Sequence, residues 1–179
     1  TAMKAIYVDV EDIIPHNMPP PLGIGIDTNA FVDTDHAGNR LTRRSHTGII
    51  IYCNMAPMLW FSKKQNTVES STFGSELIAL KIATELVEGL KYNLRMSGVP
   101  INGPSRIFCD NESVVINSSH PDSALNKKHC SIAYHRVREA VAAGKQLIYY
   151  EQSGTTLGDL LTKLLSHVRR LPLFEALLS

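Results

Sequence analysis

The 179-residue chain has few cysteines, no long apolar run and almost no net charge. Cys53, Cys109 and Cys130 are scattered and odd in number, so they fit neither a disulfide framework nor a paired-cysteine zinc site. We therefore expect a reducing, intracellular compartment. No stretch is long and apolar enough to span a membrane, and the first residues, TAMKAIYVDVED, carry acids where a secretory signal needs an apolar region. We expect neither a membrane segment nor a signal peptide.

The formal net charge of +1 excludes a highly basic scaffold but leaves a nucleic-acid ligand open. Basic residues do form short local clusters, and such clusters are usually solvated surface. Their position relative to the acids must decide whether they bind anything. The clusters are Arg40, Arg43 and Arg44; Lys63 and Lys64; Lys127, Lys128 and His129; Arg136 and Arg138; and Arg169 and Arg170.

The length suits one domain preceded by an extra segment. Residues 5–10 can form a short strand, and the run IIPHNMPPPLG that follows contains four prolines, which forbid regular structure. We interpret residues 1–28 as an N-terminal extension with a Pro-rich linker and residues 29–179 as one α/β domain.

Within residues 29–179, apolar runs and turn signals predict a regular order of elements. Strands are expected at residues 30–34, 46–53, 58–62, 105–109 and 146–151. Helices are expected at residues 74–96, from 111, at 128–143 and at 157–165, the last capped by Thr155 or Thr156. Short connections make the first three strands an antiparallel meander, and right-handed crossovers add the last two parallel to the first. The prediction is a mixed five-stranded sheet, order 3-2-1-4-5, flanked by helices.

This topology gathers four acids at one edge of the sheet. Asp33 and Asp110 end adjacent parallel strands, while Glu76 and Asp159 lie in the first turns of helices that begin at the same edge. Each acid has a structural alternative: Asp33 and Asp35 suit a turn, and Asp159 suits a helix N-terminus. Glu76 heads the apolar face of its helix, where an unpaired carboxylate is costly.

Crowded carboxylates repel one another, so such a site favours divalent cations. Oxygen ligands select hard ions such as Mg²⁺, with Mn²⁺ as a substitute, and nothing in the pattern calls for an organic cofactor. Two such ions about 3.5–4 Å apart activate a water and stabilise the leaving oxygen of a phosphodiester. The residues therefore predict phosphodiester hydrolysis.

The order of motifs resembles the ribonuclease H domain of copia-type (Pseudoviridae) retrotransposon polyproteins. The resemblance covers residues 31–165. Six segments carry it in order: FVDTDHAG; RRSHTGIIIY with LWFSKKQNTV; SSTFGSELIAL; IFCDNESV; KKHCSIAYHRVREAV; and TTLGDLLTKLL. Three details depart from the family pattern: His36 replaces Trp, residues 73–75 lack a second acid, and the loop YYEQSGTT before Asp159 has no His.

The resemblance implies that Asp33, Glu76, Asp110 and Asp159 form a catalytic tetrad that binds two Mg²⁺ ions. It also implies hydrolysis of the RNA strand of RNA–DNA hybrids, beside the reverse transcriptase domain of the same polyprotein, in a cytoplasmic virus-like particle. Asp35 belongs to the copia-type pattern and is expected to be a supporting acid at most. The missing His puts the turnover rate in doubt, though not the metal chemistry.

Substrate contacts are predicted from side-chain chemistry, with a plain surface role as the alternative for each. The hybrid is distinguished by its 2′-hydroxyls and held through its phosphates. The lone Trp60 is more typical of a core strand than of a sugar-stacking site, and His129 and His135 are interpreted as surface or structural residues. The expected substrate contacts are Arg43, Arg44, Lys63, Lys64, Gln65 and Asn111.

Two other functions fit the same fold. A DNA-acting nuclease or integrase core would need a different spacing of acids and a Glu in the last helix, where this chain has Asp159. A non-catalytic connection domain that only holds the hybrid for a polymerase would be expected to have lost acids, and all four are present here.

Overall fold

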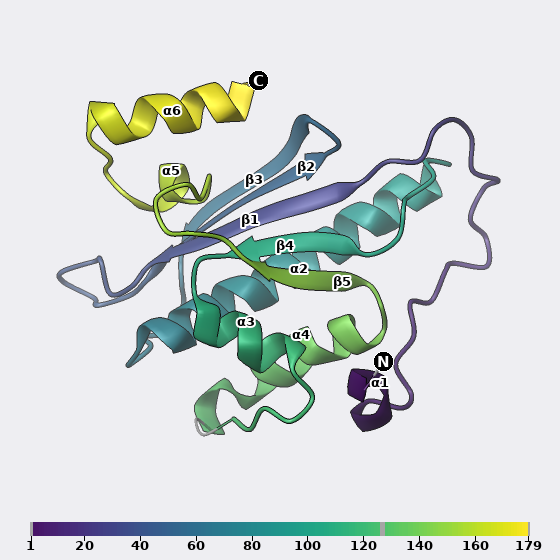
Figure 1. The fold of residues 1–179 in the computed structure, drawn as a ribbon, viewed down its shortest axis with the longest axis horizontal. Coiled ribbons are helices and arrows are strands. Elements are labelled where there is room, and N and C mark those ends of the chain that lie inside the picture. Colours follow the sequence, from purple (N-terminus) through teal and green to yellow (C-terminus); the bar gives the residue numbers. More distant parts are fainter. Residues whose placement is uncertain (1, 126–127, 179) are drawn as a thin grey trace.

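A five-stranded mixed sheet forms the centre of the molecule in the computed structural model, which describes residues 2–125 and 128–178 (Figure 1). Its strands are β1 (Thr28–Asp35), β2 (His46–Cys53), β3 (Ala56–Lys64), β4 (Ser105–Cys109) and β5 (Gln146–Tyr150). The helices are α1 (Ala2–Ile6), α2 (Thr72–Met96), α3 (Glu112–Ser119), α4 (Ser131–Ala142), α5 (Asp159–Thr162) and α6 (His167–Leu178), with a 3₁₀ turn η1 (Lys128–Cys130) before α4.

The sheet has the predicted order, β3-β2-β1-β4-β5. β1 pairs antiparallel with β2 and parallel with β4, so β1 and β4 end at the same edge. β5 continues the parallel half beside β4. The mixed sheet flanked by helices is therefore confirmed, and the edge that was expected to collect the acids exists.

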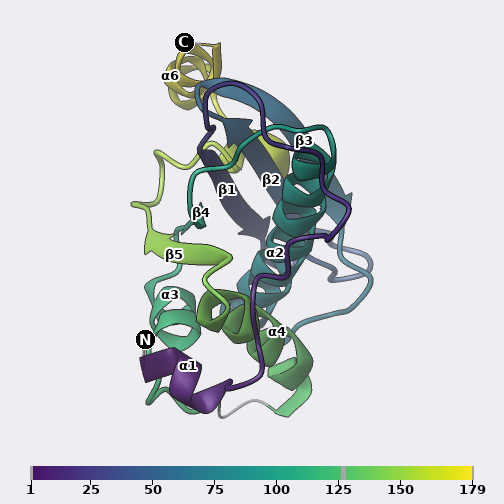
Figure 2. The same cartoon turned by 90° about the vertical axis from the view of Figure 1, so that its right-hand side faces the viewer.

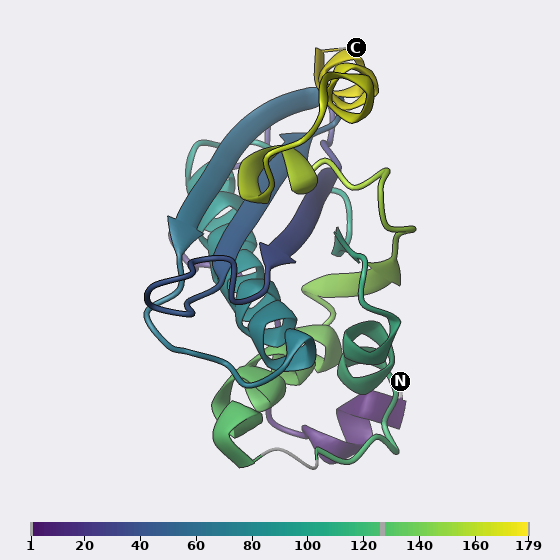
Figure 3. The same cartoon turned by 90° about the vertical axis from the view of Figure 1, so that its left-hand side faces the viewer.

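Alternation along β1 and β2 divides the core between the two faces of the sheet. Ala30, Val32, Ile49 and Ile51 pack with α2 and α4, whereas Phe31, Ile50 and Tyr52 pack with the chain around α5 and α6. Figure 2 shows α2 and α4 together beside the sheet, and Figure 3 shows α5 lying over the strands in front of α2. The sheet edge is thus approached by helices from both faces.

The N-terminal extension packs on the domain instead of extending away from it. The predicted strand at residues 5–10 is wrong, because the chain there forms α1, whose Met3 is buried and whose neighbour Tyr7 contacts α4 through the His135 ring. The Pro-rich run is irregular as expected, and Asp12, just before it, forms a bidentate ion pair with Arg95 of α2. Whether residue 28 is a domain boundary remains a prediction.

The C-terminal helix differs from the expectation for residues 157–165. Only Asp159–Thr162 is helical, Gly158 precedes it without a side-chain cap, and neither Thr155 nor Thr156 serves as the cap. Lys163 then takes an extended backbone, and a separate α6 follows that the sequence pattern did not predict. At the end of α5 the Lys163 side chain pairs with Asp159 of the same helix and with Asp33 of β1, and the second of these is a tertiary contact that local propensity does not contain.

The expectation that Trp60 belongs to the core is also wrong. Leu59 and Phe61 point to the α2 face, so alternation directs Trp60 to the other face of the edge strand β3, where it is 70% exposed.

Within the described residues, no helix is long and apolar enough to cross a membrane.

Candidate active site

The end of β1 supplies one residue to each side of the sheet edge. Asp33 is fully buried and points to the α5 side, where the Thr162 hydroxyl and the Lys163 ammonium donate hydrogen bonds to it. Thr34, the next residue, points to the α2 side, where its hydroxyl donates to Glu76 Oε1 at 2.7 Å. Strand alternation therefore connects β1 to both helices through consecutive residues.

Two glycines let α5 approach the sheet closely enough to reach Asp33. A Cβ on Gly48 of β2 would lie 2.8 Å from the carbonyl oxygen of Gly158 and 2.7 Å from Thr162 Cγ2. A Cβ on Gly158 would lie 2.7 Å from Asp33 Cβ. Since real Cβ atoms do not come this close, side chains at these positions would push α5 away from the strands.

Lys163 joins the acids of β1 and α5. Its Nζ lies 3.0 Å from Asp33 Oδ1 and 2.5 Å from Oδ1 of Asp159, which comes four residues earlier, at the start of α5. Both carboxylates are almost fully buried, whereas the Lys163 side chain is 36% exposed. Burial raises the pKa of Asp33, although its hydrogen bonds to Thr162 and Lys163 oppose that shift.

Glu76 is buried at the first turn of α2, as its position in the apolar stripe predicted. Its Oε2 is buried and has no hydrogen-bond partner among the residues that the structure describes. Burial is the main cause that raises the pKa of Glu76 to about 8; the hydrogen bond from Thr34 opposes this shift, and the charges of Asp33 and Asp110 add to it. Without a bound divalent cation, a pKa of about 8 keeps Glu76 mostly as the neutral acid at pH 7.

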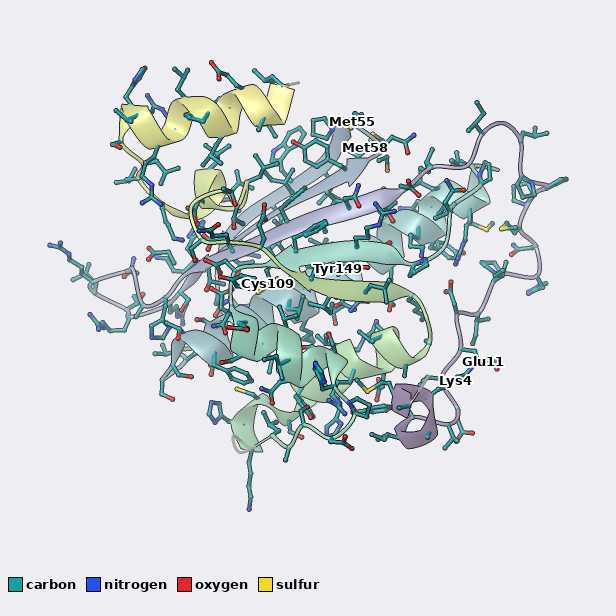
Figure 4. All side chains as sticks on the ribbon, in the orientation of Figure 1. Lys4, Glu11, Met55, Met58, Cys109 and Tyr149 are labelled. Atoms are coloured by element: carbon teal, nitrogen blue, oxygen red, sulfur yellow. The ribbon has the colours of Figure 1, made fainter. Side chains whose placement is uncertain are left out.

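Asp110 follows β4, whose last residue, Cys109, is labelled in Figure 4 at the end of that strand. Three atoms lie within 4.8 Å of one another: a carboxylate oxygen of Glu76, a carboxylate oxygen of Asp110 and the sulfur of Cys109. Ser153, in the loop after β5, donates a hydrogen bond to Asp110 Oδ2 at 3.0 Å. Burial raises the pKa of the Cys109 thiol well above its usual value, so the thiol stays protonated and is a poor ligand for a hard cation.

The four predicted acids therefore lie in one place. The charges of Asp33 and Asp110 are close enough to raise the pKa of Glu76, and the charge of Asp159 is close enough to raise the pKa of Asp33. A fifth carboxylate, Glu151, follows β5; burial raises its pKa, and the charges of Asp110 and Asp159 raise it further. Topology correctly predicted the gathering of the four acids, whereas their roles remain to be tested.

Sequence reasoning missed the fifth carboxylate, Glu151, and the residues that donate hydrogen bonds to the four acids: Thr34, Ser153, Thr162 and Lys163. Only Lys163 carried a signal that could have been used, because an acid four residues before a lysine on a helix favours an ion pair. The others depend on contacts between elements far apart in the sequence, for example the 129 residues between Thr162 and Asp33.

The acids present the donor set that Mg²⁺ or Mn²⁺ requires. They offer several carboxylate oxygens from four elements, and Glu76 Oε2 is a buried oxygen that the described part of the chain leaves unpaired. Buried polar atoms in native proteins nearly always have a partner, so this oxygen calls for one. Hard divalent cations bound through carboxylates fit this arrangement.

Asp35 and several predicted basic contacts lie beside the acids. A hollow of about 230 Å³ is lined by residues of β1, the loop after it, β2, β3 and α5: Asp35, Gly38, Asn39, Arg44, His46, Lys64 and Thr162. Arg43 and Lys63 are exposed close by in sequence. These cations are accessible, and Thr162 links the hollow to Asp33.

Two predicted substrate contacts have internal functions. Gln65 is 4% exposed, and its amide nitrogen donates to Thr47 Oγ1 and to the Ser75 carbonyl, each at 2.9 Å. We therefore withdraw Gln65 as a substrate contact, since burial closes it to a ligand. Asn111 accepts from the Val114 amide as the N-cap of α3, which leaves its own NH₂ group to contact a ligand.

Two of the three departures from the family pattern meet at the start of α2. His36 Nδ1 lies 3.1 Å from Ser75 Oγ. Beside Gly74, where the second acid is lacking, the carboxylate of Glu69 fills the space, with Oε2 2.6 Å from where a Cβ would lie. Glu69 Oε2 also lies 3.1 Å from His129 Nε2, which connects η1 to the segment just before α2.

No protein-family model matches the chain. It is 29% identical over 146 residues to the Retrovirus-related Pol polyprotein from transposon RE2 of Arabidopsis thaliana, and 29% identical over 144 residues to that from transposon RE1. These matches cover 82% and 80% of this chain. The chain spans about 10% of the length of these curated relatives.

Solved structures with the same fold are ribonucleases H. The N-terminal RNase H domain of a Mycobacterium tuberculosis protein aligns over 77% of this chain and 91% of that one, with a TM-score of 0.59 and 10% identity. LC11-RNase H1, solved in complex with an RNA/DNA hybrid, aligns over 75% of this chain and 93% of that one, with a TM-score of 0.58 and 13% identity. The resemblance inferred from the motifs is confirmed: the chain is related to copia-type transposon Pol polyproteins and has the ribonuclease H fold.

Proposed function

We propose that this chain is the ribonuclease H module of a copia-type Pol polyprotein and cleaves the RNA strand of RNA–DNA hybrids during reverse transcription. The single observation that carries the proposal is the meeting of four acids from β1, α2, β4 and α5 at one sheet edge, in a fold shared with ribonucleases H. The reverse transcriptase domain of the same polyprotein, inside a cytoplasmic virus-like particle, would be its partner.

Two Mg²⁺ ions fit the acids, with Mn²⁺ as the substitute. Asp33 and Asp110, on adjacent parallel strands, are proposed to bind both ions, while Glu76 completes one site and Asp159 the other. When bound, the ions supply an activated water and charge stabilisation for the leaving oxygen. Thr34 orients Glu76, and the burial of Asp33, Glu76 and Asp159 keeps their carboxylates from being solvated by water.

The hybrid is proposed to lie across the sheet edge, with its phosphates held by the exposed cations of the loop after β1 and the end of β3. These cations are Arg43, Arg44, Lys63 and Lys64. Asn111, next to Asp110, has an NH₂ group near the acids that suits a 2′-hydroxyl, the group that distinguishes RNA from DNA. Asp35 lines the adjacent hollow with Arg44 and Lys64, so it is proposed to orient these cations rather than to bind an ion.

The test is cleavage of a labelled RNA–DNA hybrid with Mg²⁺ or Mn²⁺, with duplex DNA and duplex RNA as alternative substrates. Asp110→Asn should lower cleavage about a thousandfold or more, since it removes an ion ligand worth several kcal/mol in the transition state. The fold should be preserved, because Asn is isosteric with Asp. Cutting of the hybrid alone that is lost in Asp110→Asn supports the proposal, and full activity of Asp110→Asn contradicts it.

The connection-domain alternative predicts no ion binding. Mg²⁺ should therefore raise the melting temperature of wild type more than that of Asp110→Asn, and equal behaviour of the two proteins would favour the alternative. Cutting of duplex DNA in preference to the hybrid would favour the integrase-like alternative.

A further inference from the structure

Lys163 is the only residue in the described part of the chain that forms ion pairs with two of the candidate ion ligands. Its Nζ lies 3.0 Å from Asp33 Oδ1 and 2.5 Å from Asp159 Oδ1. These distances are those of charge-assisted hydrogen bonds. The ammonium therefore lies between the two carboxylates, where an ion bound by both would also have to lie.

Two buried carboxylates that face each other are costly without a positive charge between them. Asp33 and Asp159 are 1% and 4% exposed at their side chains, so water compensates little of their charge. Lys163 supplies the positive charge, and the Thr162 hydroxyl adds a further donor to Asp33. Lys163 is the C-cap of α5 and has an extended backbone, and its side chain lies against both acids.

The Lys163 side chain has a route out of the site. It is 36% exposed, and its four-carbon stem can turn to solvent without moving the backbone. A divalent ion carries more charge than the ammonium and competes for the same two oxygens. Entry of the ion and departure of the ammonium are therefore linked.

We propose that Lys163 is a built-in counterion that holds Asp33 and Asp159 together in the metal-free protein and is displaced when a divalent ion binds them. This inference rests on the proposed function, since it needs an ion at these acids. Lys163 is thus a positioning residue: it stabilises the empty site and lowers the affinity of that site for the ion.

The first experiment measures ion binding without substrate. Mn²⁺ is titrated into the 179-residue chain and its Lys163→Met and Lys163→Arg variants, with free Mn²⁺ followed by electron paramagnetic resonance. Lys163→Met should bind Mn²⁺ about tenfold more tightly, an effect typical of directly coupled neighbours. The same variant should melt at a lower temperature than wild type in EDTA, and that difference should shrink at saturating Mn²⁺. Lys163→Arg keeps the charge and should bind Mn²⁺ with an affinity close to that of wild type.

Lys81→Met is the matched control. Lys81 Nζ lies 3.0 Å from Glu85 Oε1 in another i,i+4 pair, but on the surface of α2 and away from the acids. A purely structural role of Lys163 would change the melting temperature alone, as any loss of an ion pair does. Tighter Mn²⁺ binding by Lys163→Met, with Lys81→Met unchanged, is the result that a structural role does not produce.

A second measurement uses wild type and does not depend on the folding of a variant. Lysines are methylated with formaldehyde and a borane reductant and then quantified by mass spectrometry. Lys163 should be protected in EDTA and methylated faster with Mg²⁺, while the methylation of Lys81 stays constant. Equal Mn²⁺ affinity of wild type and Lys163→Met, with Lys163 equally methylated in both conditions, overturns the inference and leaves the proposed function intact. No Mn²⁺ binding by any of the proteins overturns both.

Discussion

The two pairs of acids at the sheet edge are compensated in different ways. Asp33 and Asp159 share the ammonium of Lys163, whereas Glu76 and Asp110 have no ion pair within the described residues. Glu76 instead holds a proton, with its pKa raised to about 8 by burial and by the neighbouring acids. One pair is partly neutralised by a lysine side chain, and the other is partly neutralised by protonation.

The difference shows how a site for two cations can fold without them. A lysine that is exposed at one side can be displaced, and a proton can be released, so neither form of compensation blocks ion entry permanently. Both lower the affinity for the ion, because the ion must displace a charge from one pair and a proton from the other. Metal binding to the Glu76 pair should therefore release protons at neutral pH.

The largest effect on the free energy of unfolding is expected for Glu76→Gln, which replaces the protonated acid by a permanently neutral amide. The folded protein binds the Glu76 proton more tightly than the unfolded chain does, so the free energy of unfolding is highest below pH 4.5 and falls as the pH rises to about 8. The difference between a pKa of about 8 and the usual 4.5 makes this decrease up to about 5 kcal/mol. Gln stays neutral at every pH, so Glu76→Gln should lack this decrease and should be more stable than wild type above pH 8 in EDTA.

Urea unfolding at several pH values in EDTA measures this dependence. The pKa of Asp33 is also raised, so the free energy of unfolding of Glu76→Gln should still fall with rising pH, but less steeply than that of wild type. Glu85→Gln, on the exposed side of the same helix, is the control and should follow wild type. An identical pH dependence in wild type and Glu76→Gln would show that Glu76 is not held as a neutral acid.

Gly48→Val should disrupt the Lys163 pair alone. The added side chain would collide with the Gly158 carbonyl and Thr162, forcing α5 away from β2 and costing about 3 kcal/mol of the free energy of unfolding. Urea unfolding checks the loss. Gly89→Ala is the control: nothing lies within 4 Å of its Cβ, and the change should stabilise α2 by up to about 1 kcal/mol. Wild-type stability of Gly48→Val would mean that α5 does not depend on this close approach.

The smallest effect is expected for Thr34→Val, which changes only the environment of Glu76. It removes the hydrogen bond to Glu76 Oε1, which costs about 1 kcal/mol and raises the pKa of Glu76 further, because that bond favours the ionised form. Carboxyl ¹³C NMR of Glu76 during a pH titration should show the upward shift. Thr34→Ser keeps the hydroxyl, so Glu76 should titrate in this variant as it does in wild type. An unchanged pKa of Glu76 in Thr34→Val would show that the hydrogen bond does not influence that pKa.

Elements with strong local patterns were predicted well. The bounds of β2 and β4 match their apolar runs, and α2 begins at Thr72, behind the Ser71 cap, and extends to Met96 as its periodic face predicted. The short C-terminal helices were predicted poorly. α5 has only four residues, too few for a periodic pattern, and contacts with Asp33 and β2 determine where it lies.

The candidate site divides in the same way. Which acids meet follows from strand order and the handedness of crossovers, both encoded in apolar runs and turn residues, so Asp33, Glu76, Asp110 and Asp159 could be grouped from the sequence. How each acid is compensated depends on angstrom-scale packing, and only the tertiary structure decided it. Close contact at Gly48 brings Lys163 to Asp33, and burial without a cation leaves Glu76 with its proton, since desolvation and charge pairing depend on distances that no residue pattern contains.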